Sequence, residues 1–234
     1  MTLESTFTCR DRAIFLSDIE ALVLADVHLG RDWAGACQLP IESSLDFPGR
    51  LRSLCDRFEP AHVVIAGDVL DCFRQQPPGV HDRLAAIIDV IHASDANPVL
   101  ITGNHDLQLE RLSTITPRSE WVIDDTVICH GHRVPSTAGR RYIIGHQHPA
   151  IRIEGIKRPC VLAGAEAFQD ADLLVLPAFS PLTRGTVMNH RGAADCDSPV
   201  LQDASVRALQ PVVRDEAGDT TIWFPSLEEL APYL

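Results

Sequence analysis

The chain has 234 residues, 45% of them hydrophobic, and its 32 acidic against 20 basic residues give a net charge of −12. This length and apolar content can bury a sizeable core, so we expect one domain spanning residues 1–234. No apolar run reaches the roughly 18 residues of a membrane span, and the first twenty residues lack a signal peptide's pattern, so we expect a cytoplasmic protein without a membrane partner. The acidic balance argues against a general basic groove for nucleic acid.

The cysteines and the single lysine further limit the kinds of site that the chain can form. Seven cysteines, at positions 9, 37, 55, 72, 129, 160 and 196, are odd in number and include no C-x-x-C pair. We therefore expect buried, reduced thiols, with no disulfide or zinc-ribbon framework. Lys157 is the only lysine. An acidic, lysine-poor chain fits adaptation to high salt, where screening is strong, and equally fits a GC-rich codon bias.

Five short apolar runs of strand character end on a small residue, and polar residues of the metal-ligand type follow at once. In chain order they are ALVLADVHLG at 21–30, HVVIAGDVLDCF at 62–73, VLITGNHD at 99–106, TVICHGH at 126–132 and YIIGHQH at 142–148. Continuous apolar runs of this length favour strands that are buried on both faces.

Helices separate the first three runs. Apolar residues recur at helical spacing over Pro48 to Phe58 and again over Val80 to Ile91, which gives the alternation typical of a parallel sheet. After about Trp121 strands follow one another directly, at 121–123, 126–129, 142–145, 150–153, 159–163 and 172–176. We expect a fold that is α/β in its first half and strand-rich in its second, with two packed sheets.

The remaining segments say less about function. Residues 189–205 have no clear periodicity and are expected to form a surface loop that overhangs the cleft. The last residues, TTIWFPSLEELAPYL, fit a strand, a proline break and an amphipathic turn that packs onto the same domain.

Ligands in sheets of this type gather at the carboxyl ends of strands, where all five runs end. The residues expected there are Asp26, His28, Asp68, Asp71, Asn104, His105, Asp106, His130, His132, His146 and His148. Mixed oxygen and nitrogen donors suit Mn, Fe or Zn, and this set is large enough for two ions that share one carboxylate. Two metals about 3.5–4 Å apart form a clamp for attack on phosphorus, so the pattern indicates phosphoester hydrolysis.

Each motif alone has an ordinary structural explanation. A D-x-H triplet arises by chance, GNHD can be a turn, and GHQH can be a loop with two solvent-exposed histidines. All five follow strand-like runs and occur in one chain, so we interpret them together as one site.

At these motifs the chain resembles the calcineurin-like metallophosphoesterases. The family pattern is matched by DVH at 26–28, GDVLD at 67–71, GNHD at 103–106, HG at 130–131 and GHQH at 145–148. The resemblance implies a four-layer αββα sandwich of class α/β (α+β), with two packed mixed β-sheets flanked by helices. It also implies a phosphoesterase hydrolase that uses two divalent transition-metal ions, with manganese favoured and zinc or iron as alternatives.

The resemblance also implies a role for each matched residue. Asp26, His28 and His148 would bind the first metal, Asp68 would bridge, and Asn104, His130 and His146 would complete the second. A metal-bound hydroxide would attack phosphorus, because such water has a pKa near ~7. His105 would act as the general acid that protonates the leaving oxygen, and Asp106 would orient it through a hydrogen bond.

Several other residues are weaker candidates. Arg31, His132 and Arg184 are candidates for substrate binding, as is His190, and Asp71 is expected to support the site through hydrogen bonds. His81 and Asp82 form the His-Asp pair of an all-helical class of metal phosphohydrolases, but the other histidines here end strands. The motifs of serine hydrolases, P-loop NTPases and dinucleotide-binding proteins are absent from the sequence.

A narrower resemblance bears on the substrate. LVLADVHLGR at 22–31 and LVLPAFSPLTRGT at 174–186 are similar to a small prokaryotic subgroup that includes the DNA ligase-associated metallophosphoesterases and related archaeal phosphoesterases. This implies a phosphodiester substrate in a nucleotide or nucleic acid. The alternatives are a phosphomonoesterase of the same fold and a non-catalytic metal-binding scaffold.

Overall fold

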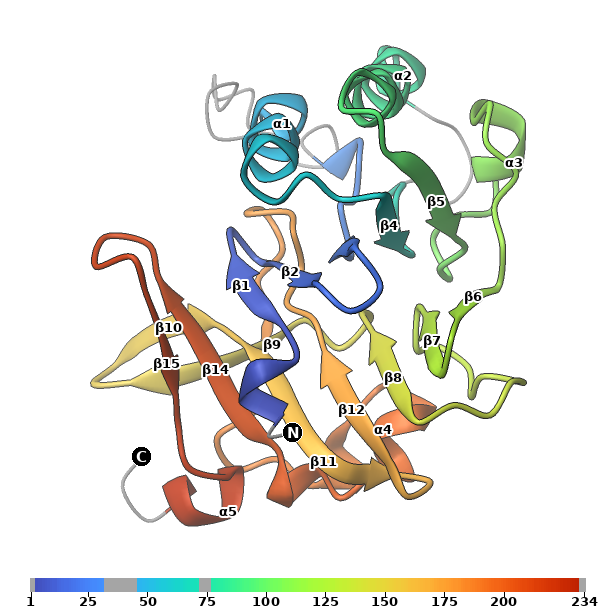
Figure 1. Ribbon diagram of the computed structural model, residues 1–234. Helices are drawn as coiled ribbons and strands as arrows, with labels where there is room; N and C mark the ends of the chain where they lie inside the picture. Colours follow the sequence, from blue (N-terminus) through green and yellow to red (C-terminus); the bar gives the residue numbers. More distant parts are fainter. Residues whose placement is uncertain (1–2, 32–45, 72–76, 232–234) are drawn as a thin grey trace.

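Two β-sheets packed face to face form the centre of the molecule (Figure 1). The computed structural model describes residues 3–31, 46–71 and 77–231. The smaller sheet has five strands in the order β1 (Thr8–Arg10), β2 (Ala13–Leu16), β3 (Ala21–Leu24), β4 (His62–Ala66) and β5 (Asn97–Ile101). The larger has seven, in the order β15 (Thr220–Trp223), β14 (Gln210–Asp215), β11 (Val161–Phe168), β12 (Ala171–Val175), β8 (Arg141–Ile144), β7 (Thr126–Cys129) and β6 (Glu120–Ile123).

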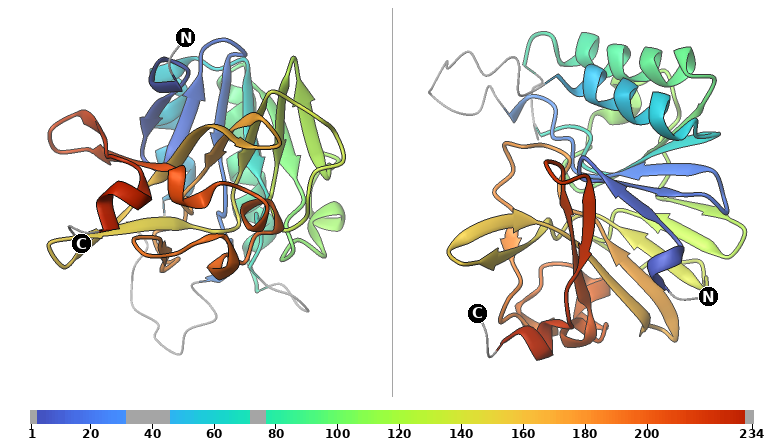
Figure 2. Two further views of the ribbon diagram at one scale, coloured as in Figure 1. Left: turned by 90° about the horizontal axis from the view of Figure 1, so that it is seen from below. Right: turned by 60° about the vertical axis from the view of Figure 1, so that its left-hand side comes forward.

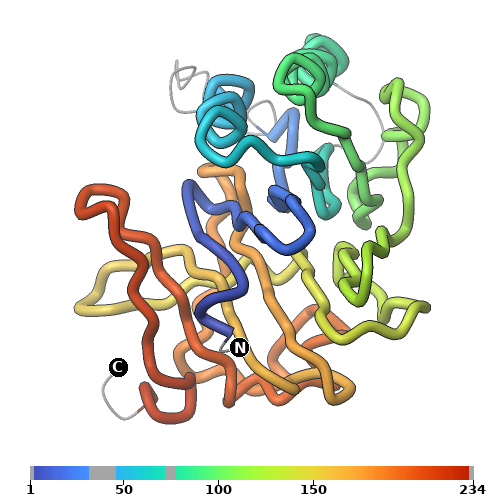
Figure 3. The backbone as a smooth tube through the Cα atoms, viewed as in Figure 1, coloured from blue at the N-terminus to red at the C-terminus, as the bar shows by residue number. Residues whose placement is uncertain are grey.

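The two helices expected from the sequence cover the outer face of the smaller sheet. These are α1 (Phe47–Phe58) and α2 (Val80–Ala93), seen at the top of Figure 1. Between them and the sheet lies a core that includes Leu51, Leu84 and Leu100. The chain path in Figure 3 shows that the blue-to-green part of the chain builds most of this half of the molecule, while the part from yellow-green to red builds the larger sheet.

Strand β3 shows why the central strands read as unbroken apolar runs. Leu22 and Leu24 face the helices, while Ala21 and Val23 face the other sheet, and all four are buried. A strand alternates its side chains between two faces, so a strand covered on both sides has no polar position. Strands β3, β4 and β5 are mutually parallel, as are β7, β8 and β12.

The expected fold class is confirmed, but the fourth layer is not made of long helices. The outer face of the larger sheet is covered by a three-stranded sheet and short helical turns (Figure 2). The three strands are β10 (Ile156–Pro159), β9 (Pro149–Ile153) and β13 (Thr186–Val187). The helical elements on this half are η1 (Leu3–Ser5), η4 (Ala193–Asp195), α4 (Pro199–Gln202), η5 (Val206–Ala208) and α5 (Leu227–Leu230). Helix α3 (Leu109–Leu112) follows β5.

The prediction of a surface loop at 189–205 was wrong, because the structure packs much of this segment into the core. Cys196, Val200 and Leu201 are buried in the core beside the larger sheet. Apolar residues here are spaced irregularly, since each short turn buries its own one or two side chains, and such spacing carries no periodicity to detect.

Strands β1, β2, β13 and β14 were not predicted, and the segment expected as one strand at 159–163 is divided between β10 and β11. The last segment agrees with expectation, as β15 precedes α5, whose Leu227 is buried. The five cysteines within the described residues are buried and free, while Cys37 and Cys72 lie outside them. Within the described ranges, none of the helices has the length and apolar character that crossing a membrane requires.

Candidate metal centre

The polar residues of the five motifs meet at the carboxyl ends of β3, β4, β5, β7 and β8, so the site is shared between the two packed sheets. Main-chain hydrogen bonds join these ends. Asp26 N–H donates to the Gly67 carbonyl (3.0 Å), and Gly145 N–H donates to the His130 carbonyl (3.0 Å). Residues up to 122 positions apart in sequence, from Asp26 to His148, therefore share one rim.

The backbone at this rim is in an unusual conformation. Five residues outside glycine have left-handed φ angles: Asp26 (58°), His28 (51°), Asp68 (47°), His146 (65°) and His148 (50°). Such a conformation costs of order 1–3 kcal/mol for a residue with a side chain, and it persists only where the surrounding structure enforces it. All five are among the residues expected to bind metal, while other residues with such φ angles, Glu59 and Asp124 among them, lie elsewhere in the structure.

Asp26, His28 and His148 form the first cluster of donor atoms. Asp26 is fully buried, its carboxylate accepts the His146 N–H (3.1 Å), and its Oδ1 lies 3.1 Å from His148 Nε2. The rings of His28 and His148 meet edge to face, with centroids 5.4 Å apart.

Asp68, His130 and His146 form the second cluster. His130 Nδ1 lies 3.0 Å from the Ala66 carbonyl, which accepts only if this nitrogen carries the hydrogen. His130 Nε2 then points at three other atoms: His146 Nδ1 (3.2 Å), Asn104 Oδ1 (3.2 Å) and Asp68 Oδ1 (3.4 Å).

Asp68 lies between the two clusters. Its Oδ1 faces His130, while its Oδ2 lies 3.9 Å from His28 Nε2. The two oxygens of one carboxylate thus point towards different sets of histidines, which is the arrangement that a shared ligand needs. Asp68 Oδ1 also accepts the main-chain N–H of His105 (3.0 Å).

The charges around these groups shift their pKa values. Burial acts to raise the pKa of Asp26, but the neighbouring His148 and His130 outweigh it and lower the value. Burial acts to lower the pKa of His130, yet the hydrogen bond to Asp68 and the charges of Asp26 and Asp68 raise it to about 9. Burial and the charge of His130 lower the pKa of His146 to about 4.

The spacing of the donor atoms fits metal coordination better than it fits hydrogen bonding among the side chains themselves. Ligands held at about 2.0–2.2 Å from one ion at tetrahedral or octahedral angles lie about 3–3.5 Å apart, and the close donor pairs of both clusters fall at 3.1–3.4 Å. Neither ring nitrogen of His28, nor Nε2 of His148, makes a hydrogen bond of good geometry within the described residues, although all three atoms are buried. Buried nitrogens without such bonds, facing carboxylates, are what a cation between them would satisfy.

Two glycines allow the strand ends to come this close. A Cβ on Gly103 would lie 2.1 Å from Asp68 Oδ1, and a Cβ on Gly67, whose φ is 84°, would lie 2.4 Å from His130 Nδ1. Both distances are impossible for a real side chain, so the motifs GDVLD and GNHD need their glycines for packing the site.

His105 lies at the edge of the site, and the carboxylate of Asp106 binds main-chain groups of two loops. The His105 side chain is 19% exposed, with ring nitrogens 3.8 Å from Asp68 Oδ2 and 3.9 Å from Asp71 Oδ1. The carboxylate of Asp106 accepts main-chain N–H groups of Leu70 (2.8 Å), Gly103 (2.8 Å) and Val69 (3.3 Å). Asp106 therefore joins the loop after β4 to the loop after β5.

Asp71 and Arg31 extend the site beyond the clusters. Asp71 Oδ1 lies 3.1 Å from His28 Nδ1, and His28, Asp71 and His105 form a third group of donor atoms. Arg31 donates to Asp71 Oδ1 (3.1 Å) and to Thr183 Oγ1 (2.8 Å). Thr183 was not anticipated from the sequence, since a lone threonine in SPLTRGT carries no signal of its own.

The remaining candidate residues lie outside the two main donor clusters. The ring of His132 lies tilted beside that of His130, with centroids 5.2 Å apart, but His132 belongs to none of the three donor groups. Arg184 is exposed and lines a pocket that His148 also lines. His81 and Asp82 pair on the exposed face of α2, and the sheets around the site exclude the all-helical class. His190 is exposed.

Comparison with known proteins agrees with this geometry. The family model for calcineurin-like phosphoesterases matches residues 19–210, so the chain belongs to this family of metal-dependent hydrolases, whose members use two metal ions. No curated protein matches the chain.

Two solved structures resemble the chain. A nuclease, MPE, from Pseudomonas putida is 21% identical with a TM-score of 0.63, and the match covers 92% of each chain, so the two share a fold. YfcE, a phosphoesterase from E. coli, is 14% identical with a TM-score of 0.43, over 86% of this chain and 96% of that one.

Proposed function

We propose that the chain hydrolyses phosphodiester bonds at a two-metal centre, with the seven residues Asp26, His28, Asp68, Asn104, His130, His146 and His148 as ligands. The observation that carries the proposal is Asp68, whose two oxygens face different histidine clusters. Manganese is the favoured ion, with zinc or iron as alternatives, because the donors are mixed oxygen and nitrogen atoms. When bound, such ions supply a nucleophile at neutral pH and neutralise charge on the phosphoryl oxygens.

His105 is proposed as the general acid. Its partly exposed ring stands in edge contact with His28, with centroids 5.2 Å apart, so it is close to the site without belonging to either of the two main clusters. The carboxylates of Asp68 and Asp71 lie close to its ring nitrogens. An imidazole in this position can pass a proton to the leaving oxygen.

A diester in a nucleotide or nucleic acid is the proposed substrate. Support comes from the resemblance of residues 22–31 and 174–186 to a prokaryotic subgroup with such substrates, and from the shared fold with a nuclease. A phosphomonoesterase and a metal-binding scaffold remain the alternatives that an assay must separate.

The test is turnover of bis-p-nitrophenyl phosphate and p-nitrophenyl phosphate by protein reconstituted with Mn, Zn or Fe. We expect Mn to support turnover, with a higher kcat/KM for the diester. Loss of a supporting residue around a metal site costs about 10–100-fold, so Asp68→Asn should cost more than about 100-fold. His92→Ala, which removes an exposed histidine of α2, is the control and should retain activity.

Three outcomes would contradict the proposal in different ways. Preference for the monoester would indicate a phosphomonoesterase. No turnover of either ester with any ion would indicate a scaffold. Full activity in Asp68→Asn would show that this carboxylate does not bridge two ions.

A further inference from the structure

An unfavourable pair of charges stands beside the proposed metal centre. Arg152 on β9 and Lys157 on β10 are directly opposite each other in the antiparallel register. Like charges at such positions destabilise a sheet. Both side chains are exposed, and neither they nor Arg184 take part in an ion pair within the described part of the chain. Lys157 is the only lysine, and the chain as a whole is strongly acidic.

The structure holds these cations in place. The buried side chain of Asn189 bonds both main-chain groups of Arg152: its Oδ1 accepts the N–H (2.9 Å), and its Nδ2 donates to the carbonyl (2.8 Å). The Lys157 ammonium donates to the carbonyls of Arg184 and Gly185. Burial, together with the charges of Arg152 and Arg184, lowers the pKa of Lys157, so the three cations act on one another.

The three cationic residues lie on or beside the β9–β10 hairpin, which begins next to the metal centre. Strand β9 begins at Pro149, immediately after His148, and at about 3.3 Å per residue Arg152 is about 13 Å along the chain from this proposed ligand. A pocket of about 170 Å³ is lined by His148, Lys157 and Arg184 together, with Arg12 and Thr183. In Figure 1 the β9–β10 hairpin projects from the left side of the molecule.

The β9–β10 hairpin carries Arg152, Lys157 and Arg158 against one acidic residue, Glu154, so its local charge is positive while the net charge of the whole chain is −12. At physiological salt the Debye length is about 8 Å, so acidic residues elsewhere on the surface are largely screened from this hairpin. A polyanion is repelled by most of the molecule and attracted here, which would confine it to a path that ends at the metal centre.

Building on the proposed phosphodiesterase function, we propose that Arg152, Lys157 and Arg184 bind the phosphates that flank the scissile phosphate. The substrate is then a nucleic-acid strand, and a small isolated diester lacks the additional phosphates that these cations hold. Repulsion between Arg152 and Lys157 lowers the stability of the hairpin, and the same two charges provide the binding site for phosphate.

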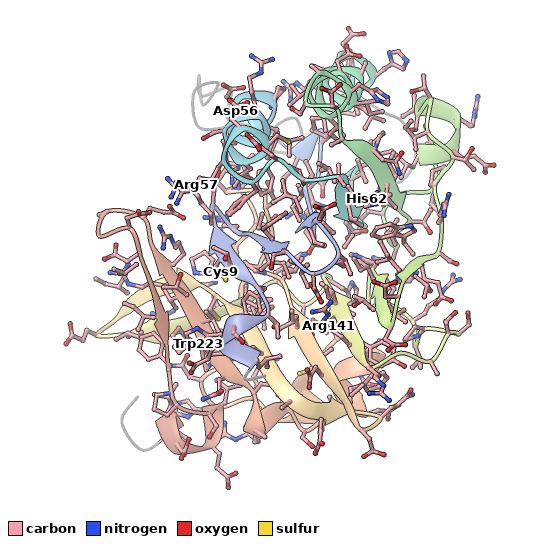
Figure 4. All side chains as sticks on the ribbon, in the orientation of Figure 1. Cys9, Asp56, Arg57, His62, Arg141 and Trp223 are labelled. Carbon is pink, nitrogen blue, oxygen red and sulfur yellow. The ribbon has the colours of Figure 1, made fainter. Side chains whose placement is uncertain are left out.

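The test compares two double variants that change the net charge equally. Arg152→Gln with Lys157→Gln removes the opposed pair. Arg52→Gln with Arg57→Gln removes two exposed arginines of α1, where Figure 4 labels Arg57. Binding of a fluorescent single-stranded oligonucleotide is measured by anisotropy, and kcat/KM is measured for that oligonucleotide and for bis-p-nitrophenyl phosphate, between about 50 and 200 mM salt.

We expect the hairpin variant to bind the oligonucleotide about 10-fold more weakly than wild type, with a log–log salt slope about 1.4 smaller, since each phosphate contact on a single strand contributes ~0.7. Its ratio of oligonucleotide to bis-p-nitrophenyl phosphate kcat/KM should fall in step, whereas the α1 variant should match wild type. The Tm of both variants, measured beside binding, establishes that each remains folded.

The inference is overturned if the hairpin and α1 variants bind the oligonucleotide alike, or if wild type does not bind it at low salt. Because binding is measured separately from turnover, these outcomes are distinct from failure of the proposed function, which would show as a wild-type protein that hydrolyses no ester.

Discussion

His105 is the side chain on which the proposed proton transfer depends. It is partly exposed at the edge of the metal centre and lies close to two carboxylates, Asp68 and Asp71. A proton donor matters most when the leaving oxygen is a strong base, because p-nitrophenolate departs readily while an alkoxide does not.

His105→Ala should therefore lower kcat in a way that depends on the leaving group. We expect a loss of about 10²–10⁴-fold for a diester with an alkyl leaving group and a clearly smaller loss for bis-p-nitrophenyl phosphate, with metal content unchanged. Steady-state kinetics on both esters, beside metal analysis, measure this. Equal losses on both esters would remove His105 from the role of general acid.

His130 gives the metal affinity a dependence on pH. Burial opposes the charge of His130, but Asp68 and Asp26 raise its pKa to about 9 in the metal-free protein. Below that value His130 carries a proton on the nitrogen that would bind the ion, so metal must displace it. Raising the pH towards 9 therefore increases metal affinity.

Calorimetric titration with Mn at pH 7.5, in two buffers of different ionisation enthalpy, should show proton release on binding. At about pH 9.5 the release should largely disappear. Proton release that is the same at both pH values would show that His130 is not the group displaced.

The sequence predicted which residues converge, because each motif follows a strand and parallel strands present their carboxyl ends on one rim. It did not predict the left-handed backbone at Asp26 or His146, since no residue type there demands that conformation. It also did not predict that Asp106 accepts the main-chain N–H groups of Leu70 and Gly103, because only the fold brings these groups near its carboxylate.

Among the elements, the turn after β5 controls how closely the strand ends approach. Gly103 leaves room for Asp68, whose Oδ1 and N atoms would lie 2.1 and 2.4 Å from an added Cβ. Gly103→Ala should displace Asp68, with loss of bound metal and of activity, both measured on the purified variant. Gly192→Ala, whose added Cβ would meet only Asp195 Oδ2 at 3.9 Å, is the matched control. Normal metal content in Gly103→Ala would show that this turn can yield without loss of the site.

The segment at 189–205 is hydrogen-bonded to the loops that carry the site residues. The buried Ser198 hydroxyl donates to the Gly131 carbonyl (2.6 Å), and Gln147 Oε1 accepts the Asp197 N–H (3.0 Å). Gly131 and Gln147 lie next to His130, His146 and His148 in sequence, so this layer supports the loops that carry those residues.

Ser198→Ala should leave the Gly131 carbonyl without its partner, at a cost of about 1–3 kcal/mol, because an unpaired buried polar group loses its hydrogen bond to water as well. For a domain of about 150–250 residues, Tm shifts by about 2–4 °C per kcal/mol. Calorimetry should find that Tm falls by several degrees. An unchanged Tm would show that the hydrogen bond from Ser198 to the Gly131 carbonyl does not stabilise the fold.

At the scale of the whole molecule, the sheets with long, doubly buried strands were predictable and the fourth layer was not. The run over β3 has the apolar continuity of a covered strand, and α1 and α2 have the periodicity of surface helices. By contrast η4, α4 and η5 have three or four residues each, too few to establish any period. Family membership and the shared fold with a nuclease agree with the predicted part.

The metal content of the reconstituted protein tests the account most directly, because every proposed role depends on two ions sharing Asp68. Elemental analysis of protein saturated with Mn and freed of excess should find two ions per chain in wild type, and His146→Ala, which removes a donor of the second cluster only, should retain about one. A wild-type protein that is fully folded by circular dichroism yet holds one ion or none at saturation would contradict the two-metal centre.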